Sequence, residues 1–303
     1  MSVTGAYRSL VGVEGLEVTR DASLAPCTAY RIGGPADLLV CAHGYRALAH
    51  ALRALADEGV PWVVLGRGSS ILASDEGYRG CVVRLGQEFS RTLVEGDRMT
   101  AGAAVMLPQL VNESLSRELA GLESCVGIPG TVGGAVSTNA GSRHDWVGRR
   151  VRDVVTLRPG RGMSRYAGSE IEWGYRWCSL PPDEIILEVT LELTRSSKDV
   201  VATEMNRRLA RRRAAQPMRR LCCGPVFRDP GERSAGALLD ACDLKGMRVG
   251  GAHVCETHAN LIVNEGHATA RDVVTVMGRM HDAVQARFGV DLVPEVKFLG
   301  FEG

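Results

Sequence analysis

Two glycine-rich segments of this chain are suited to holding phosphate groups. The first, Gly66-Arg67-Gly68-Ser69-Ser70, follows an apolar run. Small residues leave backbone N–H groups open to a pyrophosphate. The segment lacks the Gly-Lys-Ser/Thr of a Walker loop and the third glycine and downstream acid of a dinucleotide fingerprint. By itself, this segment is more often just a turn.

The second segment strengthens the phosphate interpretation. Gly127, Gly130, Gly133 and Gly134 fall within eight residues, together with Pro129. A single turn needs fewer glycines than this segment contains, and each glycine lets another group approach the backbone closely. Two such loops in one chain could clamp the two ends of a long dinucleotide cofactor.

A metal site is the other chemistry that residue types suggest. His253, Cys255 and His258 are closely spaced, and Cys222 and Cys223 could complete a ligand set. Adjacent cysteines are a poor tetrahedral pair compared with Cys-x-x-Cys. We therefore expect no metal.

Alternating elements surround the first loop. An apolar run at 36–41 precedes a helical pattern with Leu48, Leu52 and Leu55 on one face, ended by Gly59. A strand is predicted at 61–65, directly before the loop.

A second block of elements surrounds the second loop. Strands are predicted at 81–85 and 99–103, before a helix carrying Val111, Leu115 and Leu119. Further strands are predicted at 151–157 and 184–193. The helix predicted at 199–215 is rich in arginine, and we expect its arginines to form a solvated face. Those arginines are Arg207, Arg208, Arg211, Arg212 and Arg213.

The last hundred residues have a compact α+β pattern. Thr269 to Asp272 resembles a capping box, an apolar helical stripe follows, and Gly289 ends it. A strand is predicted at 294–299. By pattern, the chain divides into segments of about 1–90, 91–200 and 201–303.

Composition excludes several classes of protein. The net charge of +1 gives no argument for nucleic acid or a membrane surface as a partner. The N-terminus has no apolar signal region, and no apolar run is long enough to span a membrane. We expect a cytoplasmic protein, a monomer or small homo-oligomer, whose nine cysteines are free thiols.

Longer motifs resemble the family of UDP-N-acetylenolpyruvoylglucosamine reductase, the MurB family. Thr28-Ala-Tyr-Arg-Ile-Gly-Gly-Pro-Ala-Asp37 resembles its N-terminal motif, and 65–80 and 121–141 resemble its two flavin loops. The arginine-rich stretch ending in Gln216-Pro217 and the segment Pro294 to Gly300 follow in the family's order. The resemblance is collinear over about residues 25–300.

The resemblance implies an α+β fold of the MurB and vanillyl-alcohol-oxidase type. Two FAD-binding subdomains, 1–90 and 91–200, would precede a C-terminal α+β substrate domain, 201–303. FAD would be bound noncovalently, with NADPH as a possible reductant. The residues expected to bind FAD are Gly66, Arg67, Gly68, Ser69, Ser70, Ile71, Ile128, Pro129, Gly130, Gly133, Gly134 and Asn139.

The family's reaction adds hydride to C3 of an enolpyruvyl ether on UDP-N-acetylglucosamine, and an acid protonates C2. Such chemistry needs a clamp on the carboxylate and a positioned proton donor. The resemblance assigns the clamp and charge stabilisation to Arg176, with Tyr175 beside it, and to Glu295. The family's acid is a serine, sometimes a cysteine. Pro225 stands in its place here, and proline has no transferable proton.

Other departures gather around the expected substrate site. Asp229 replaces an asparagine, Cys178 a serine and His253 a glutamine, and the segment 142–145 lacks the family's Tyr-Gly. We expect Cys178, Arg228, Asp229 and His253 to contact substrate. The flavin loops keep the family's pattern apart from minor swaps such as Ser70 for Asn.

This contrast favours an FAD-dependent oxidoreductase repurposed for another carboxylated or nucleotide-linked small molecule in a specialised pathway. One alternative is the cell-wall reductase itself, with water or a neighbouring thiol in place of the serine. Another alternative is a flavin-binding pseudoenzyme, which the presence of Arg176 and Glu295 disfavours.

Overall fold

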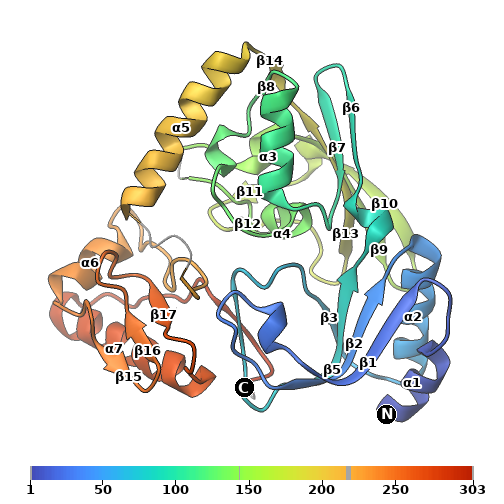
Figure 1. Ribbon diagram of the computed structural model, residues 1–303, viewed down its shortest axis with the longest axis horizontal. Helices are drawn as coiled ribbons and strands as arrows, with labels where there is room; N and C mark the ends of the chain where they lie inside the picture. Colours follow the sequence, from blue (N-terminus) through green and yellow to red (C-terminus); the bar gives the residue numbers. More distant parts are fainter. Residues whose placement is uncertain (1, 143, 216–219, 302–303) are drawn as a thin grey trace. The chain divides into compact units, whose positions relative to one another are not determined.

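The computed structural model describes residues 2–142, 144–215 and 220–301 (Figure 1). Its contacts divide the chain into two compact units, each built from three separate segments. Unit 1 contains residues 1–20, 38–66 and 80–212, and unit 2 contains 21–37, 67–79 and 213–303. The division into three successive segments made from the sequence stays a prediction. The Gln216-Pro217 motif lies outside the described residues.

The first sheet has the strand order β1-β2-β5-β3. These strands are β1 (Leu16–Ser23), β2 (Pro35–Ala42), β5 (Tyr78–Leu85) and β3 (Trp62–Val64). Two helices accompany them, α1 (Val3–Leu10) and α2 (Tyr45–Asp57). Leu48, Leu52 and Leu55 are buried, which confirms the predicted apolar face of α2. The strand predicted before the first glycine loop is confirmed as β3, which runs parallel to β5.

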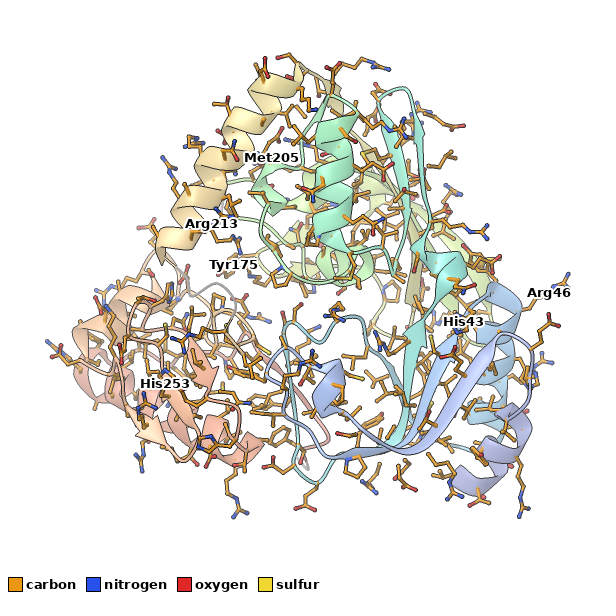
Figure 2. All side chains as sticks on the ribbon, viewed as in Figure 1. His43, Arg46, Tyr175, Met205, Arg213 and His253 are labelled. Carbon is orange, nitrogen blue, oxygen red and sulfur yellow. The ribbon has the colours of Figure 1, made fainter. Side chains whose placement is uncertain are left out.

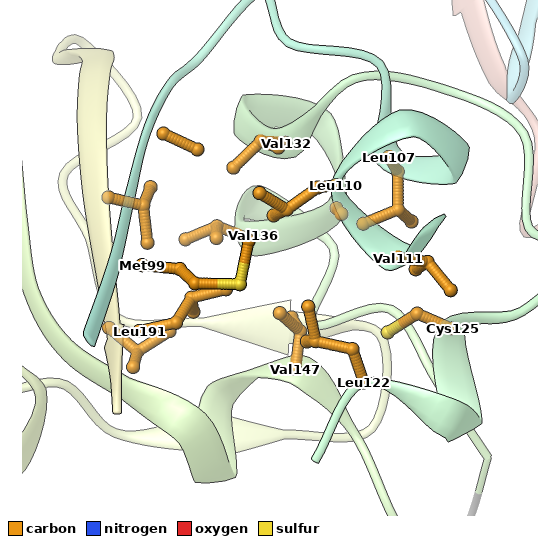
Figure 3. Packing of buried hydrophobic residues seen from close by; sticks show 14 of the residues in the cluster. Met99, Leu107, Leu110, Val111, Leu122, Cys125, Val132, Val136, Val147 and Leu191 are labelled. Atoms are coloured by element: carbon orange, nitrogen blue, oxygen red, sulfur yellow. The ribbon is translucent and has the colours of Figure 1, made fainter. Parts of the chain in front are cut away.

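The second sheet is antiparallel, in the order β10-β9-β13-β7-β6. Its strands are β6 (Thr92–Glu95), β7 (Arg98–Gly102), β9 (Val151–Arg158), β10 (Gly162–Ala167) and β13 (Ile185–Glu192). The helices α3 (Leu107–Ser116) and α4 (Val132–Ser137) share a buried core with this sheet. Figure 3 shows Met99 and Leu191 of the sheet close to Val136 of α4.

One helix boundary differs from the prediction. The sequence pattern extended the third helix to Leu119, but α3 ends at Ser116. Glu118 takes a left-handed conformation with φ 58°, which breaks the helix. Leu119 lies instead in the short strand β8 (Leu119–Ala120), paired with β14 (Thr194–Arg195). Its side chain is buried in the same core, which explains why its spacing fitted the helical stripe.

The C-terminal part of unit 2 is a three-stranded antiparallel sheet with helices. The strands are β15 (Arg248–Val249), β16 (Ala252–Val254) and β17 (Ile262–Asn264), and the helices are α6 (Ala235–Ala241) and α7 (Ala270–Phe288). Thr269 and Asp272 form the predicted capping box of α7, and Gly289 ends it with φ 65°. The strand predicted at 294–299 is shorter: β18 (Lys297–Leu299) pairs in parallel with β4 (Ile71–Ala73), directly after the first glycine loop.

Two expectations from composition can be compared with the structure. The nine cysteines, all within the described ranges, form no disulfide with one another. In the described ranges, no helix has the length and apolar content needed to cross a membrane.

Candidate active site

The first glycine loop is held by backbone contacts within unit 2. Gly68 has φ 59°, and a Cβ at this position would lie 2.3 Å from the carbonyl oxygen of Cys27. The N–H of Ala29 donates to the carbonyl of Gly68 at 3.1 Å. The predicted N-terminal motif therefore packs directly against the loop. Among the described residues, the structure gives no acceptor for the N–H groups of residues 67–70, which leaves them available to a phosphate.

The second glycine loop opens the helix α4. Thr131 caps this helix by accepting a hydrogen bond from the N–H of Gly134, and the N–H of Gly133 donates to Ala103. A Cβ on Gly66 would lie 2.6 Å from Oγ1 of Thr131. Within unit 1, Gly66 at the start of the first loop therefore lies so close to Thr131 of the second loop that only glycine fits at position 66. In unit 2, the N–H groups of residues 67–70, for which no acceptor is found among the described residues, fit a pyrophosphate-bearing cofactor.

Arg176 lies at the turn of a short hairpin formed by β11 (Trp173–Gly174) and β12 (Trp177–Cys178). Its φ of 58° is unusual for a residue with a side chain. Nη1 donates to the carbonyl of Gly141 at 3.3 Å, and the guanidinium lies 5.4 Å from the ring centre of Tyr175. Tyr175, labelled in Figure 2, is 44% exposed. Backbone strain of this kind gathers at functional sites, so it supports a functional role for Arg176.

Asn139 supports this hairpin. Its Nδ2 donates to the carbonyl of Gly174 at 2.9 Å, and its Oδ1 accepts from the N–H of Gly148 at 3.1 Å. The residue is buried and also has positive φ. Cys178, on the same hairpin, directs its thiol at the carbonyl of Ser137. The side chain of Asn139 thus contacts protein groups, and its cofactor contact stays a prediction.

Arg212 is a candidate site residue that the sequence analysis missed. It lies on α5 (Lys198–Ala215), and a Cβ on Gly127 of the second loop would lie 3.0 Å from its Cδ. Burial and the nearby charge of Arg176 lower the pKa of Arg212. Two guanidinium groups placed close together favour an anion between or beside them. Arg212 lies at helical spacing from Val201 and Met205, the buried residues of α5, and therefore on the same face of the helix. This spacing could have distinguished Arg212 in the sequence.

The other arginines of α5 partly fit the prediction of a solvated face. Arg207, Arg211 and Arg213 are exposed. Arg207 and Arg208 both bind the carboxylate of Glu204, whose pKa they lower to about 2. The prediction of a solvated face is therefore wrong for Arg212 and for Arg208, which is 29% exposed and lies 3.6 Å from the carboxylate of Asp145.

Pro225 and Glu295 lie on adjacent extended segments of unit 2. The N–H of Glu295 donates to the carbonyl of Val226 at 2.8 Å, and the N–H of Arg228 donates to Val293 at 2.9 Å. Phe227 and Pro294 form a bridge between these two bonds. The structure therefore brings together the position of the missing proton donor and the predicted glutamate.

Two buried asparagines bind backbone groups of unit 2, and the sequence analysis missed both. Asn260 accepts from the N–H of Phe227 at 3.0 Å and donates to its carbonyl at 2.8 Å. Asn264 donates to the carbonyl of Tyr30 and accepts from the N–H groups of Gly266 and Ala268. The sequence did contain a signal for them, since both asparagines flank an apolar run, Asn260-Leu-Ile-Val-Asn264. Amides buried with such a run need hydrogen-bond partners.

The predicted substrate contacts of unit 2 have protein partners. Asp229 accepts a hydrogen bond from the N–H of Ala235 at 2.9 Å, at the start of α6. His253 (labelled in Figure 2) lies on β16, with Nδ1 3.1 Å from the carboxylate of Glu265. Burial and the charge of Arg248 lower its pKa. A substrate contact for these residues stays a prediction.

Metal-ligand groupings differ from the one considered in the sequence. Among the described residues, Glu17, Cys41 and His43 bring three ligand atoms within 4.8 Å of one another. Nδ1 of His43 accepts the N–H of Gln87, and its Nε2 lies 3.1 Å from a carboxylate oxygen of Glu17.

Comparisons with known proteins identify the family. The C-terminal domain of UDP-N-acetylenolpyruvoylglucosamine reductase matches residues 216–299, and an FAD binding domain matches residues 36–157. UDP-N-acetylenolpyruvoylglucosamine reductase 2 of Symbiobacterium thermophilum is 40% identical over 294 residues, which cover 97% of this chain and 95% of that protein. The chain belongs to the UDP-N-acetylenolpyruvoylglucosamine reductase family.

Further relatives agree with this assignment. The Anaeromyxobacter dehalogenans protein with the same family name is 43% identical over 289 residues, covering 94% of this chain and 86% of that protein. The crystal structure of the reductase from Thermus caldophilus matches with a TM-score of 0.82 and 34% identity, covering 94% of this chain and 98% of that one. The predicted α+β fold with an FAD-binding part is thereby confirmed.

The chain is an FAD-dependent oxidoreductase. The residues present fit FAD, because the N–H groups of residues 67–70, which have no acceptor in the part of the chain that the structure describes, suit its pyrophosphate. The individual cofactor contacts, including Ile71, Ile128, Pro129 and Gly130, stay predictions.

Proposed function

We propose that this chain catalyses the NADPH-dependent reduction of UDP-N-acetylglucosamine enolpyruvate to UDP-N-acetylmuramate, a step of peptidoglycan synthesis. The observation that carries the proposal is 40% identity to a protein of that reductase name along 97% of the chain. The full-length structural similarity to the Thermus caldophilus reductase supports it. FAD, when bound, carries hydride from NADPH to the substrate.

In this proposal Arg176 and Arg212 provide the positive charge that receives the substrate carboxylate. Support comes from the strained turn at Arg176 and from the partly buried guanidinium of Arg212, whose lowered pKa reflects burial and the charge of Arg176. An anion between such groups relieves their repulsion and replaces lost solvation. The resemblance also implies a part in charge stabilisation for Glu295, on the segment beside Val226 in unit 2.

The sequence departures favoured a repurposed enzyme, but the comparisons support the reductase alternative instead. The 40% identity to the Symbiobacterium thermophilum protein extends along 97% of the chain. Losing a general acid costs about 10²–10⁴-fold in rate, so Pro225 is compatible with a slower reductase. The pseudoenzyme alternative gains no support from the contacts of Arg176 or Glu295.

The test is turnover of the purified FAD-bound protein with NADPH and UDP-N-acetylglucosamine enolpyruvate. We expect NADPH consumption that depends on the enolpyruvyl substrate and a product heavier by two hydrogen atoms in mass spectrometry. Gly130→Asp, which puts a carboxylate in the second loop, is the negative control and is expected to be colourless. NADPH oxidation without the heavier product would contradict the proposal.

A further inference from the structure

Unit 1 contains a group of three side chains that the proposed reaction does not use. Glu17 lies on β1, Cys41 on β2 and His43 directly after β2. A carboxylate oxygen, Sγ and a ring nitrogen of these residues all lie within 4.8 Å of one another. Carboxylate, thiolate and imidazole are all ligands that zinc accepts in proteins. The three residues therefore have the chemistry of a metal site.

The pairing of two strands brings these side chains together. The N–H of His43 donates to the carbonyl of Gly15 at 2.8 Å, so the residues after β2 lie beside those before β1, and the strands are antiparallel. Cys41 is two residues before His43, and Glu17 is two residues after Gly15, so Cys41 and Glu17 are opposite each other. Residues far apart in a local pattern thus meet through the sheet.

The ring of His43 (labelled in Figure 2) is held in one direction. Side chains alternate along a strand, so Cys41 and His43 share one face of the sheet while Ala42 packs into the core on the other. The ring lies against Gly86, where an added Cβ would collide with Nδ1. The side chain of His43 is 26% exposed, and part of its rotational freedom is already lost in the fold. This placement lowers the entropy cost of binding a ligand.

Nε2 of His43 is the atom that indicates a ligand. It is buried, and among the described residues it has no hydrogen-bond partner of acceptable geometry, although Oε1 of Glu17 lies 3.1 Å away. Buried polar atoms without partners are rare in proteins and costly. An ion between Nε2, the carboxylate and the thiol of Cys41 would satisfy it. The side chain of Glu17 is 76% exposed and can therefore adjust to the ion.

The charges of these ligands balance those of a divalent ion. Burial raises the pKa of the Cys41 thiol, and the charge of Glu17 raises it further, whereas Arg84 lowers it. Without an ion the thiol is therefore protonated at neutral pH, and it releases this proton to solvent when an ion binds. The thiolate and the carboxylate then neutralise the two positive charges of the ion.

We propose that Glu17, Cys41 and His43 bind one divalent cation, Zn²⁺, through a carboxylate oxygen, Sγ and Nε2, with water as the fourth ligand. Metal on Nε2 leaves the ring proton on Nδ1, which without metal accepts the N–H of Gln87 at 3.4 Å. That contact is long for a hydrogen bond, and metal binding replaces it. The ion ties β1 to β2 and stabilises the first sheet.

The test uses untagged, FAD-loaded protein that is freed of metal with EDTA, dialysed and titrated with ZnCl₂. We expect one equivalent to bind in calorimetry and thermal unfolding to move to a higher temperature. X-ray absorption at the zinc edge should show one sulfur at about 2.3 Å and nitrogen or oxygen at about 2.0–2.2 Å. Cys41→Ser and His43→Gln should each weaken binding by about tenfold or more, and Cys41→Ser should remove the sulfur signal.

Cys242→Ser is the matched control, because Cys242 is also half-buried but belongs to unit 2, and it should bind zinc as the wild type does. Equal binding by the wild type and Cys41→Ser, or a sulfur signal that persists in that variant, would reveal an adventitious ion only and overturn the proposal. Failure of the wild type to bind one equivalent would overturn it as well.

Glu17→Gln keeps the proposal testable if Cys41→Ser does not fold, which circular dichroism shows. It changes an exposed carboxylate and is also expected to weaken zinc binding by about tenfold or more, while an unchanged affinity would contradict the site. None of these measurements uses the enolpyruvyl substrate, so their outcome and that of the proposed function are separate.

Discussion

The N–H of Glu295 donates to the carbonyl oxygen of Val226 at 2.8 Å. This bond fixes the register of two extended segments and places the glutamate opposite the residue that follows Pro225. The two segments are 69 positions apart in the sequence (295 minus 226), so no local pattern predicts their pairing. The backbone at the position of the family's serine thus runs beside the segment that carries Glu295.

Asn260 is predicted to maintain this register. Its amide binds both the N–H and the carbonyl of Phe227, and Asn260→Ala would leave two buried backbone groups without partners. We expect a loss of at least about 2 kcal/mol in the free energy of unfolding, measured by denaturant titration. The exposed Asn112→Ala should change stability by less than about 0.5 kcal/mol. Equal stability of the two variants would show that the clamp is unimportant.

Gly68 is predicted to be indispensable for the flavin loop. In Gly68→Ala the new Cβ would lie 2.3 Å from the carbonyl oxygen of Cys27, in addition to the cost of positive φ. Gly246→Ala is the matched control, because Gly246 has φ 76° with nothing within 4 Å. We expect about 1 kcal/mol of destabilisation in the control and about 1–3 kcal/mol more in Gly68→Ala, with weakened FAD binding measured by fluorescence titration. Normal FAD affinity in Gly68→Ala would remove this loop from the cofactor site.

Arg176 is predicted to anchor the substrate carboxylate. Charge-assisted hydrogen bonds contribute a few kcal/mol, so Arg176→Ala should lower kcat/KM by about 10²-fold or more. Arg161, which is exposed on the β9–β10 turn, provides a control variant, Arg161→Ala, with no expected effect. Unchanged kinetics in Arg176→Ala would remove this residue from the site.

His281 is predicted to make stability depend on pH. Hydrogen bonds to Asp291, and then to Asp282, raise the pKa of His281 above 6.5. The charged histidine therefore stabilises the fold fully below about pH 6.5, and this contribution is lost as the pH rises through the raised folded-state pKa. His281→Gln should lower the free energy of unfolding by less than about 1 kcal/mol at pH 6 and by nothing at pH 9, since the pair is solvent-exposed. A larger effect at the higher pH would contradict this assignment.

Local patterns predicted the elements that hold the site. Glycine spacing identified both loops, the apolar stripe of Leu48, Leu52 and Leu55 identified α2, and Thr269 with Gly289 marked both ends of α7. These signals succeed because helical periodicity, capping and positive φ are properties of a few neighbouring residues. Leu119 shows the limit, because burial in the same core imitated a helical position.

The supporting residues of the site were harder to predict. Asn139 and Asn260 act through hydrogen bonds to backbone groups 35 and 33 positions away, which no local pattern encodes. Arg212 looked like one more arginine on a charged helix, although its position on the face of Met205 distinguished it. The partners of Asp229 and His253, too, were visible only after the chain had folded.

The most direct test of the proposed function is a single anaerobic turnover. The FAD-bound wild type is photoreduced without NADPH and mixed with UDP-N-acetylglucosamine enolpyruvate, or with UDP-N-acetylglucosamine as the control, while flavin absorbance is recorded. We predict full reoxidation by the enolpyruvyl compound, with one equivalent of UDP-N-acetylmuramate formed, and no reoxidation by the control. Flavin that stays reduced in the presence of the enolpyruvyl compound would contradict the assignment of this chain as a reductase of that substrate.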